Sequence, residues 1–249
     1  MDNELIAVSP QMQEVKKLIS LVRGISVNTI IMGDEGVGKS LSAKLIVPNA
    51  IAVSGRKPED VIKALKNFDE VIIEDFDKLP NADSLHTSGK KIVATSRKKI
   101  KDSTLDKLFG IKIDIEPLSK RPEDISPLVE YFIEKAQKEL ELYEELDAQT
   151  VARDISKNCH TLKRSAYQAL LCSSLDEEQL TSVMENYFFT RLDDADDNYK
   201  RFLDIFDSAI INANHKMFKS QLMMSYKMGI NRNTLRKKIL QLGKKLTDE

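Results

Sequence analysis

The sequence contains only two cysteines, Cys159 and Cys172, and has no CxxC pair or Cys/His cluster. It therefore indicates neither a disulfide framework nor a zinc site. It also has no run of eighteen apolar residues, and its first residues lack the basic-then-apolar pattern of a secretion signal. We expect a soluble, cytoplasmic protein with no membrane partner. Its 249 residues can form one large domain and a smaller one, or two modest domains.

Acidic residues are missing from one long stretch near the end of the chain. No Asp or Glu occurs between Ser208 and Thr247, although the net charge of the whole chain is −1. Residues 1–207 therefore carry a charge of about −8. A basic run is often only a solvated face, but one of this length favours a polyanionic partner. The cations in it are Lys216, Lys219, Lys227, Arg232, Arg236, Lys237, Lys238, Lys244 and Lys245.

A phosphate-binding pattern, GDEGVGKS, covers Gly33–Ser40. An apolar run of strand length precedes it and a helical pattern follows it, which is the context in which such loops hold nucleotide phosphates. Backbone N–H groups would surround the phosphates, Lys39 would reach the outer ones, and Ser40 would ligate Mg²⁺. An ordinary glycine turn is the alternative. The predicted nucleotide-binding residues here are Gly33, Glu35, Gly36, Val37, Gly38, Lys39, Ser40 and Leu41.

Short apolar runs of strand type alternate with helical segments in the first half of the chain, which predicts an α/β domain with a parallel sheet covered on both faces. The strands are expected at 29–32, 50–53, 71–74, 91–95 and 111–115. Four helices are expected between residues 122 and 190. The predicted parts are an α/β nucleotide-binding subdomain (1–121), a helical lid subdomain (122–190), a linker (191–198) and a helical DNA-binding and dimerisation domain (199–249).

Two acids, Glu74 and Asp75, lie at the end of the third expected strand. In phosphate-loop enzymes one acid at this place holds Mg²⁺, and a neighbouring carboxylate polarises the attacking water. We assign contact with the metal to Ser40, Glu74 and Asp75, and a catalytic role to Asp75. A surface turn after a strand also accepts acids, so this prediction depends on the phosphate loop.

Several motifs occur in an order that resembles a known family. IAVSPQMQEVKKLI, GDEGVGKS, IEDFDKLP, ATSR and IEPLSKRPEDISPLVEYFIEKA resemble the ATPase domain of NtrC-type bacterial enhancer-binding proteins, the sigma-54-dependent activators of the AAA+ class. MGINRNTLRKKILQLG resembles their Fis-type helix-turn-helix, and the resemblance runs from Ile6 to Gly243. It implies a phosphate-loop AAA+ sheet, a helical lid, a C-terminal helix-turn-helix, and a bacterial, nucleoid-associated protein.

The departures from the family pattern concern hydrolysis and the sigma factor. Between Ser40 and Val71 there is no room for the loop that grips sigma-54, so we expect no contact with it, and we expect no receiver domain before Ile6. The family's Asp-Glu pair is reversed in Glu74 and Asp75. Lysine lacks the planar fork of arginine, and the residues at the arginine-finger positions are Lys101 and Lys107.

Two further positions differ from the family pattern. Ser96 replaces an asparagine of the first sensor, and His160 replaces an arginine of the second. Both are still expected to contact nucleotide. The resemblance thus implies a degenerate domain that binds ATP or ADP with Mg²⁺ and is at most a weak ATPase.

The end of the chain predicts two helices joined by a turn at Gly229, of which the second would enter the major groove of double-stranded DNA. Arg232 is the first choice for a guanine contact, and Arg236 and Lys237 come next. The predicted DNA-binding residues are Asn231, Arg232, Asn233, Thr234, Arg236, Lys237 and Lys238, with Asn231, Thr234 and Lys238 assigned to phosphates. A helix over 199–213 carries an apolar stripe that indicates the core of this domain or the seam of a homodimer: Phe202, Ile205, Phe206, Ala209, Ile210 and Ala213.

These features together favour a sequence-specific DNA-binding transcription regulator with a degenerate AAA+ domain. The alternative is an active DNA-dependent ATPase, such as an initiator-like or remodelling factor, because those proteins also join an AAA+ core to a helix-turn-helix.

Overall fold

The structure, a computed structural model, describes residues 5–194 and 196–243. The chain divides into two compact units, Met1–Ser174 (unit 1) and Leu175–Glu249 (unit 2). Lys244 and Lys245 of the basic stretch lie outside the described residues. Across 5–194 and 196–243, none of the helices combines the length and the apolar composition needed to cross a bilayer.

Unit 1 contains a five-stranded sheet with the order β2-β3-β4-β1-β5. Every strand pair in the described part is parallel. The prediction of a parallel sheet is therefore confirmed, and β5 has the predicted bounds. Because β1 lies between β4 and the edge strand β5, the loop that follows β1 lies at the carboxyl edge of the sheet, where the strand order changes direction. The strands are β1 (Thr29–Gly33), β2 (Ile51–Ser54), β3 (Glu70–Glu74), β4 (Lys91–Ser96) and β5 (Ile111–Ile115).

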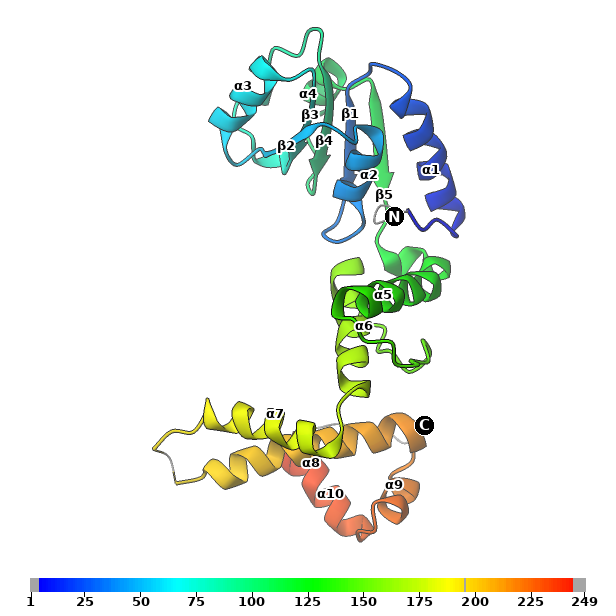
Figure 1. The fold of residues 1–249 in the computed structure, drawn as a ribbon, viewed down its shortest axis with the longest axis vertical. Coiled ribbons are helices and arrows are strands. Elements are labelled where there is room, and N and C mark those ends of the chain that lie inside the picture. Colours follow the sequence, from blue (N-terminus) through cyan, green and yellow to red (C-terminus); the bar gives the residue numbers. More distant parts are fainter. Residues whose placement is uncertain (1–4, 195, 244–249) are drawn as a thin grey trace. The chain divides into compact units, whose positions relative to one another are not determined.

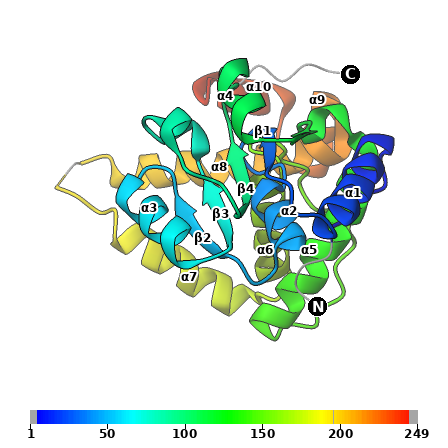
Figure 2. The same cartoon turned by 90° about the horizontal axis from the view of Figure 1, so that it is seen from above.

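Helices cover both faces of the sheet (Figures 1 and 2). On one face, Val22 and Ile46 pack with Ile31 of β1 in the first core cluster. On the other face, Val61 packs with Ile73 in the second cluster. Burial on both faces explains why the inner strands β1 and β3 are apolar runs, whereas the edge strand β5 alternates between apolar and charged residues. The first face carries α1 (Pro10–Arg23) and α2 (Lys39–Ile46), and the second carries α3 (Pro58–Asn67) and α4 (Asp102–Leu108).

Two residues define the start of α1. The Ser9 side chain caps the helix by accepting a hydrogen bond from Met12 N, and Pro10 occupies the first helical position. Ser9 is also tied to the helical part of unit 1, because its hydroxyl donates to Asp124 Oδ2 over 2.8 Å. The cap therefore fixes α1 against a residue more than a hundred positions away in the chain.

A helical subdomain completes unit 1. Helices α5 (Ile125–Leu140) and α6 (Cys159–Ser173) share a third core cluster that includes Phe132 and Leu162. Short 3-10 helices cover Phe76–Lys78, Ala82–Ser84, Leu118–Lys120 and Pro122–Asp124.

The prediction of four helices in residues 122–190, all of which the structure describes, is wrong, since only three α-helices form there. Residues 141–158 instead form turns and irregular structure. The side chains of Asp147 and Asp154 accept hydrogen bonds from nearby backbone N–H groups, which competes with helix formation.

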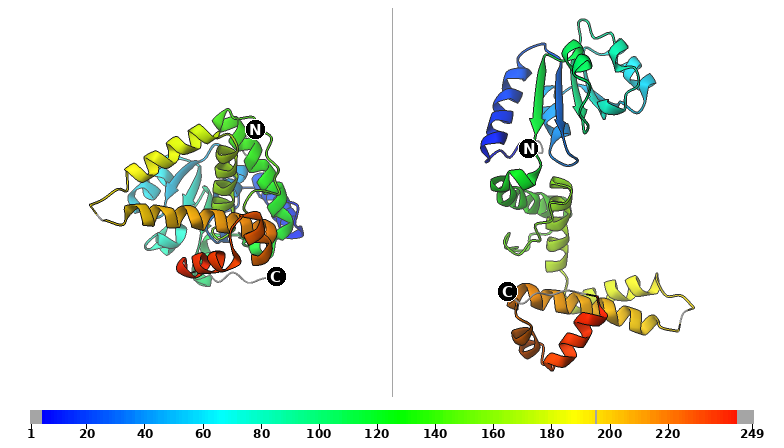
Figure 3. Two further views of the ribbon diagram at one scale, coloured as in Figure 1. Left: turned by 90° about the horizontal axis from the view of Figure 1, so that it is seen from below. Right: turned by 180° about the vertical axis from the view of Figure 1, so that it is seen from behind.

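Unit 2 consists of α7 (Glu177–Phe189), α8 (Asn198–Phe218), α9 (Gln221–Lys227) and α10 (Arg232–Gln241), as Figure 3 shows from below and behind. The helix α7 lies in the segment predicted as a helical lid (122–190), but it groups with the C-terminal helices. Its end meets the start of α8 through Phe188 and Phe202, whose ring centroids are 4.6 Å apart. The core of the unit holds Ile211, Met224, Leu235 and Ile239.

The apolar stripe of α8 does not form that core. Within the described residues, Ile211 is the buried residue of α8, whereas Ile205 and Phe206 are 44% and 46% exposed. The core interpretation of the stripe is therefore wrong for Ile205 and Phe206. The physical reason is that the core cluster of α9 and α10 gathers around Ile211 and Phe218, near the end of α8.

Candidate nucleotide site and basic helix

The phosphate loop lies between β1 and α2 and depends on its glycines. Gly38 caps α2 with φ 110°, and Gly36 has φ 77°. A Cβ at Gly36 would lie 2.3 Å from the carbonyl oxygen of Lys157. Only glycine therefore allows the loop to turn this way while it packs against the segment before α6.

Lys39 is folded back onto its own loop. Its Nζ donates to the carbonyl oxygens of Gly33 and Asp34 over 2.8 and 2.6 Å. Burial lowers the pKa of Lys39, and the positive charge of Arg97 lowers it further. The ammonium group is thus held at the phosphate end of the loop, where a second cation lies nearby.

The two acids after β3 have different surroundings. Glu74 accepts a hydrogen bond from the Ser40 hydroxyl over 2.7 Å. Asp75 has the left-handed conformation with φ 50°, and its carboxylate pairs with Arg56 Nε at 2.9 Å and with Arg97 Nε at 3.7 Å. The predicted metal acid therefore touches the phosphate loop, whereas the predicted catalytic acid is engaged by two arginines.

The first-sensor position departs from the prediction. Ser96 is buried, and its hydroxyl donates to Lys98 O and Asp77 Oδ1 over 2.7 and 3.3 Å. Its neighbours on both sides, Thr95 and Arg97, line the cavity described below. Arg97 Nη1 pairs with Oε2 of Glu35 in the phosphate loop at 2.9 Å.

The start of α6, in the helical subdomain, holds the phosphate loop through hydrogen bonds. Asn158 donates from its side-chain amide to Glu35 O over 2.8 Å and accepts from Leu118 N over 2.7 Å. The backbone N–H of Cys159 donates to Gly36 O over 3.1 Å, and His160 Nδ1 lies 3.6 Å from Glu35 Oε1. Residues that the sequence separates by more than a hundred positions therefore set the shape of the phosphate loop.

A buried arginine connects the phosphate loop to the start of the helical subdomain and to the residues before α1. Arg121 donates through Nη2 to Val37 O over 3.0 Å and pairs through Nη1 with Asp124 Oδ2 at 3.2 Å. Asp124 also accepts from the backbone N–H groups of Val8 and Ser9. Burial by itself raises the pKa of Asp124, but the bonds from Ser9 and Val8 and the charge of Arg121 hold it below its ordinary value.

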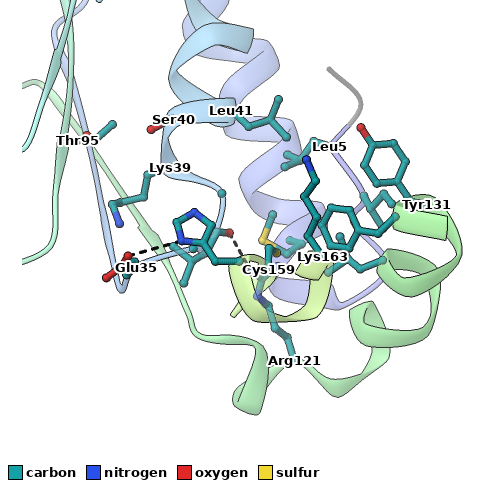
Figure 4. A pocket seen from close by; sticks show the side chains of 18 of the residues that line it. Leu5, Glu35, Lys39, Ser40, Leu41, Thr95, Arg121, Tyr131, Cys159 and Lys163 are labelled. Atoms are coloured by element: carbon teal, nitrogen blue, oxygen red, sulfur yellow. Dashed lines mark hydrogen bonds and ion pairs between the residues drawn. The ribbon is translucent and has the colours of Figure 1, made fainter. Parts of the chain in front are cut away.

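A cavity of 450 Å³ lies between the phosphate loop and the helical subdomain of unit 1. Figure 4 shows Glu35, Lys39, Ser40 and Thr95 at one end, and Leu5, Tyr131 and Lys163 at the other. The first end presents charged groups, and the second is mainly apolar but also has Lys135 and Lys163 in its lining. The apolar lining comprises Leu5, Ile6, Met12, Leu128, Tyr131 and Phe132. A molecule with a phosphate chain and a flat apolar head would match this division.

Most of the predicted nucleotide residues come together in this cavity. Gly33 and Ser96 are not among the residues that line it in the described structure. Arg97 and Lys163 also line it and are not among the predicted site residues, although Arg97 belongs to the ATSR motif. The predicted residues that do line it are Glu35, Gly36, Val37, Gly38, Lys39, Ser40, Leu41, Glu74, Asp75 and His160.

A divalent cation would rely on few protein ligands here. In the part of the chain that the structure describes, no group of three or more His, Cys, Asp or Glu side chains is placed to hold a metal ion. The Ser40 hydroxyl and the Glu74 carboxylate are adjacent oxygen donors, which suits Mg²⁺ bound together with phosphate oxygens.

The second candidate site is the exposed face of α10. Asn231 caps this helix by accepting from Asn233 N over 2.8 Å, and Leu235 and Ile239 are buried beneath it. Lys238 is half-buried and pairs with Asp207 of α8. The other predicted DNA-binding residues are exposed: Asn231, Arg232, Asn233, Thr234, Arg236 and Lys237.

No protein-family model and no curated protein matches this sequence. Solved structures do match the fold. NtrX from Brucella abortus, crystallised in complex with ATP, aligns with a TM-score of 0.57 at 17% identity over 96% of this chain and 69% of its own. The complex of the same protein with ADP aligns with a TM-score of 0.58 at 16% identity over 96% and 70%.

AMPPCP-bound DnaA from Aquifex aeolicus aligns with a TM-score of 0.46 at 14% identity, over 97% of this chain and 90% of its own. At these identities the likeness to NtrX shows the fold alone. The chain has the AAA+ α/β fold, a parallel sheet flanked by helices, followed by C-terminal helices.

Proposed function

We propose that this protein is a sequence-specific DNA-binding transcription regulator whose AAA+ domain holds ATP or ADP and hydrolyses it slowly or not at all. The observation that carries the nucleotide part is the phosphate loop, with Lys39 held over it and Ser40 bonded to Glu74. The cavity extends from this loop to an apolar end that suits a nucleobase. NtrX, which shares the fold, was crystallised with ATP and with ADP.

Magnesium would enter with the nucleotide. Ser40 and Glu74 would hold it, and when bound it would neutralise charge on the phosphates. Lys39 binds the outer phosphates, and the N-terminus of α2 adds a favourable dipole.

Slow hydrolysis follows from the groups around the phosphates. Asp75, the candidate for orienting water, pairs with Arg56 and Arg97. A missing arginine finger alone reduces the rate by about 10³- to 10⁵-fold. Of the lysines at the finger positions, Lys101 is exposed and Lys107 donates to Asp83 O over 2.6 Å.

Action through sigma-54 is not part of this proposal. The segment between α2 and β3 forms only the edge strand β2 and the helix α3 in the described structure. In the described structure this segment does not contain an insertion like the sigma-54-binding loop of the NtrC-type enhancer-binding proteins.

DNA binding rests on α9 and α10. Gly229, with φ 64°, lies between the two helices, as in a helix-turn-helix of Fis type. The second helix would place Arg232 and its neighbours in the major groove. Lys238 differs from the other candidates because it pairs with Asp207, so a phosphate contact would have to compete with that pair.

A homodimer would cover apolar surface that one chain leaves exposed. On α8 this surface includes Leu203, Ile205 and Phe206, and on α7 it includes Leu180 and Val183. Apolar stripes of this kind mark interaction sites, and a two-fold dimer would present two copies of α10 to a palindromic site.

A steady-state ATPase assay with and without double-stranded DNA tests the proposal against an active DNA-dependent ATPase. The presence of Asp75 and Arg97 in one cavity is the observation that favours the alternative. We expect turnover far below the usual enzyme range and no stimulation by DNA. Turnover of about 1 s⁻¹ or faster would favour the active ATPase.

A further inference from the structure

Arg97 follows the strand that lies next to the phosphate loop. In the register of β4 with β1, Ser96 pairs with Met32, one residue before Gly33. Arg97 lines the same cavity as Lys39, and Figure 4 shows Thr95, two residues earlier, at the end of the cavity that holds Lys39 and Glu35. The cationic side chains of Lys39 and Arg97 therefore both line the part of the cavity where the outer phosphates of a nucleotide would lie.

The backbone of Arg97 is fixed. Its N–H donates to Asp77 Oδ1 over 3.2 Å, and the Asp77 side chain is only 4% exposed. The hydroxyl of Ser96 donates to the same oxygen. Asp77 is thus a positioning residue that holds the end of β4, while the Arg97 side chain, 46% exposed, is able to change partners.

Two carboxylates of the cavity now engage the Arg97 guanidinium. Nη1 lies 2.9 Å from Glu35 Oε2, and Nε lies 3.7 Å from Asp75 Oδ1. Ion pairs between partly exposed side chains contribute little free energy, because water and salt screen their charges. A phosphate group carries more negative charge and matches the planar fork of arginine, so it would displace Glu35 from Arg97.

We propose that Arg97 contacts the terminal phosphate of a bound nucleoside triphosphate and makes the site prefer triphosphate to diphosphate. This inference rests on the proposed nucleotide binding. A diphosphate is held by the loop and Lys39 and leaves Arg97 paired with Glu35. A triphosphate takes Arg97 away from Glu35, so Glu35 acts as its competitor.

Calorimetric titration with ADP and with the non-hydrolysable triphosphate AMPPCP, both with Mg²⁺, tests the inference. In Arg97→Ala we expect AMPPCP affinity to fall about 10- to 100-fold and ADP affinity to change less than about 3-fold. In Glu35→Gln we expect AMPPCP affinity to rise about 2- to 5-fold with little change for ADP. The two variants thus move the preference in opposite directions.

Arg56→Ala is the matched control. Arg56 also pairs with Asp75, but it is not one of the residues that line the described cavity. We expect this variant to keep the wild-type ratio of the two affinities. A change in the ratio of AMPPCP affinity to ADP affinity in Arg56→Ala would overturn the inference. The preference for triphosphate would then depend on Asp75, which both arginines contact.

The inference would also be overturned if Arg97→Ala weakened the binding of AMPPCP and ADP equally, or left the ratio of the two affinities unchanged. If Arg97→Ala fails to fold by circular dichroism, Arg97→Lys replaces it, and we expect a smaller drop in the same ratio because lysine lacks the fork. Failure of the wild type to bind ADP would contradict the proposed function instead.

Discussion

The hydroxyl of Ser40 donates a hydrogen bond to Glu74 Oε1 over 2.7 Å, although 34 positions separate the two residues in the chain. The bond joins the first turn of α2 to the end of β3. The loop that would hold phosphates and the acid that would hold Mg²⁺ are therefore adjacent. Lys39 bonds to the carbonyl oxygens of Gly33 and Asp34 in the same loop.

Removal of the Ser40 hydroxyl should weaken the dependence of nucleotide binding on Mg²⁺. We expect Ser40→Ala to bind ADP with nearly the same affinity with Mg²⁺ or with EDTA, because one metal ligand is lost. Wild type should bind at least about 5-fold more tightly with Mg²⁺. Ser40→Thr keeps the hydroxyl and should restore the difference in the same titration. Equal Mg²⁺ dependence in all three proteins would remove Ser40 from the metal site.

The stability of unit 1 should depend on the ionised form of Asp124. Its pKa is lowered in the folded protein despite burial, because Ser9 and Val8 donate hydrogen bonds to it and Arg121 lies beside it. An ordinary Asp titrates near pH 3.9. The stabilisation is therefore complete above about pH 4 and is lost as the pH falls through the folded-state value.

Asp124→Asn removes this titration. We expect the variant to be destabilised by about 3–5 kcal/mol at neutral pH, because Arg121 stays buried without its charged partner. We also expect its melting temperature to fall less than that of wild type between about pH 5 and pH 2. Thermal unfolding followed by circular dichroism measures both effects. Parallel pH profiles in the two proteins would contradict this assignment.

Base reading by Arg232 should be separable from phosphate contact. If two copies of α10 read DNA, the protein should prefer a pseudo-palindrome with half-sites about 34 Å apart. We expect Arg232→Ala to lose about 1–3 kcal/mol on that site and to relax the preference at one base position in each half-site.

Lys227→Ala is the matched control, since Lys227 is an exposed cation of α9, the helix that would cross the DNA backbone. We expect this variant to weaken binding to all duplexes alike and to lower the salt slope by about 1. Binding of both variants to specific and scrambled duplexes over a salt series checks the roles. Equal loss on both duplexes for Arg232→Ala would reject base reading.

The apolar surface of α8 should hold the dimer together. Phe206 is 46% exposed, so Phe206→Glu should produce a monomer without lowering the melting temperature of unit 2 by more than about 4 °C. Tyr226→Glu, an equally drastic change at an exposed residue of α9, should leave the dimer intact. Light scattering measures the mass. A hexamer formed on addition of nucleotide would contradict the dimer and favour an active ring.

The fold was largely predictable because the strands and helices depend on local patterns. The cap at Ser9 and the bounds of β5 both follow from residues close in sequence. The irregular segment 141–158 was mispredicted as helical. The side chains of Asp147 and Asp154 accept hydrogen bonds from nearby backbone N–H groups, and these bonds compete with a helix.

The site was less predictable, because its contacts depend on topology. Asn158 reaches Glu35 across 123 positions, and Arg97 reaches it across 62. Neither pairing has a signal in sequence spacing. The partnership of Arg97 with the loop could have been suspected only from the parallel register of β4 beside β1.

The central claim is that the phosphate loop holds a nucleotide, and a calorimetric titration of wild type and Lys39→Ala with ADP tests it most directly. Lys44→Ala, an exposed lysine on the same helix, is the matched control. We expect wild type and Lys44→Ala to bind one ADP per chain with equal affinity, and Lys39→Ala to bind about 100-fold more weakly or not at all. Absence of binding to wild type, or equal binding to wild type and Lys39→Ala, would contradict the claim.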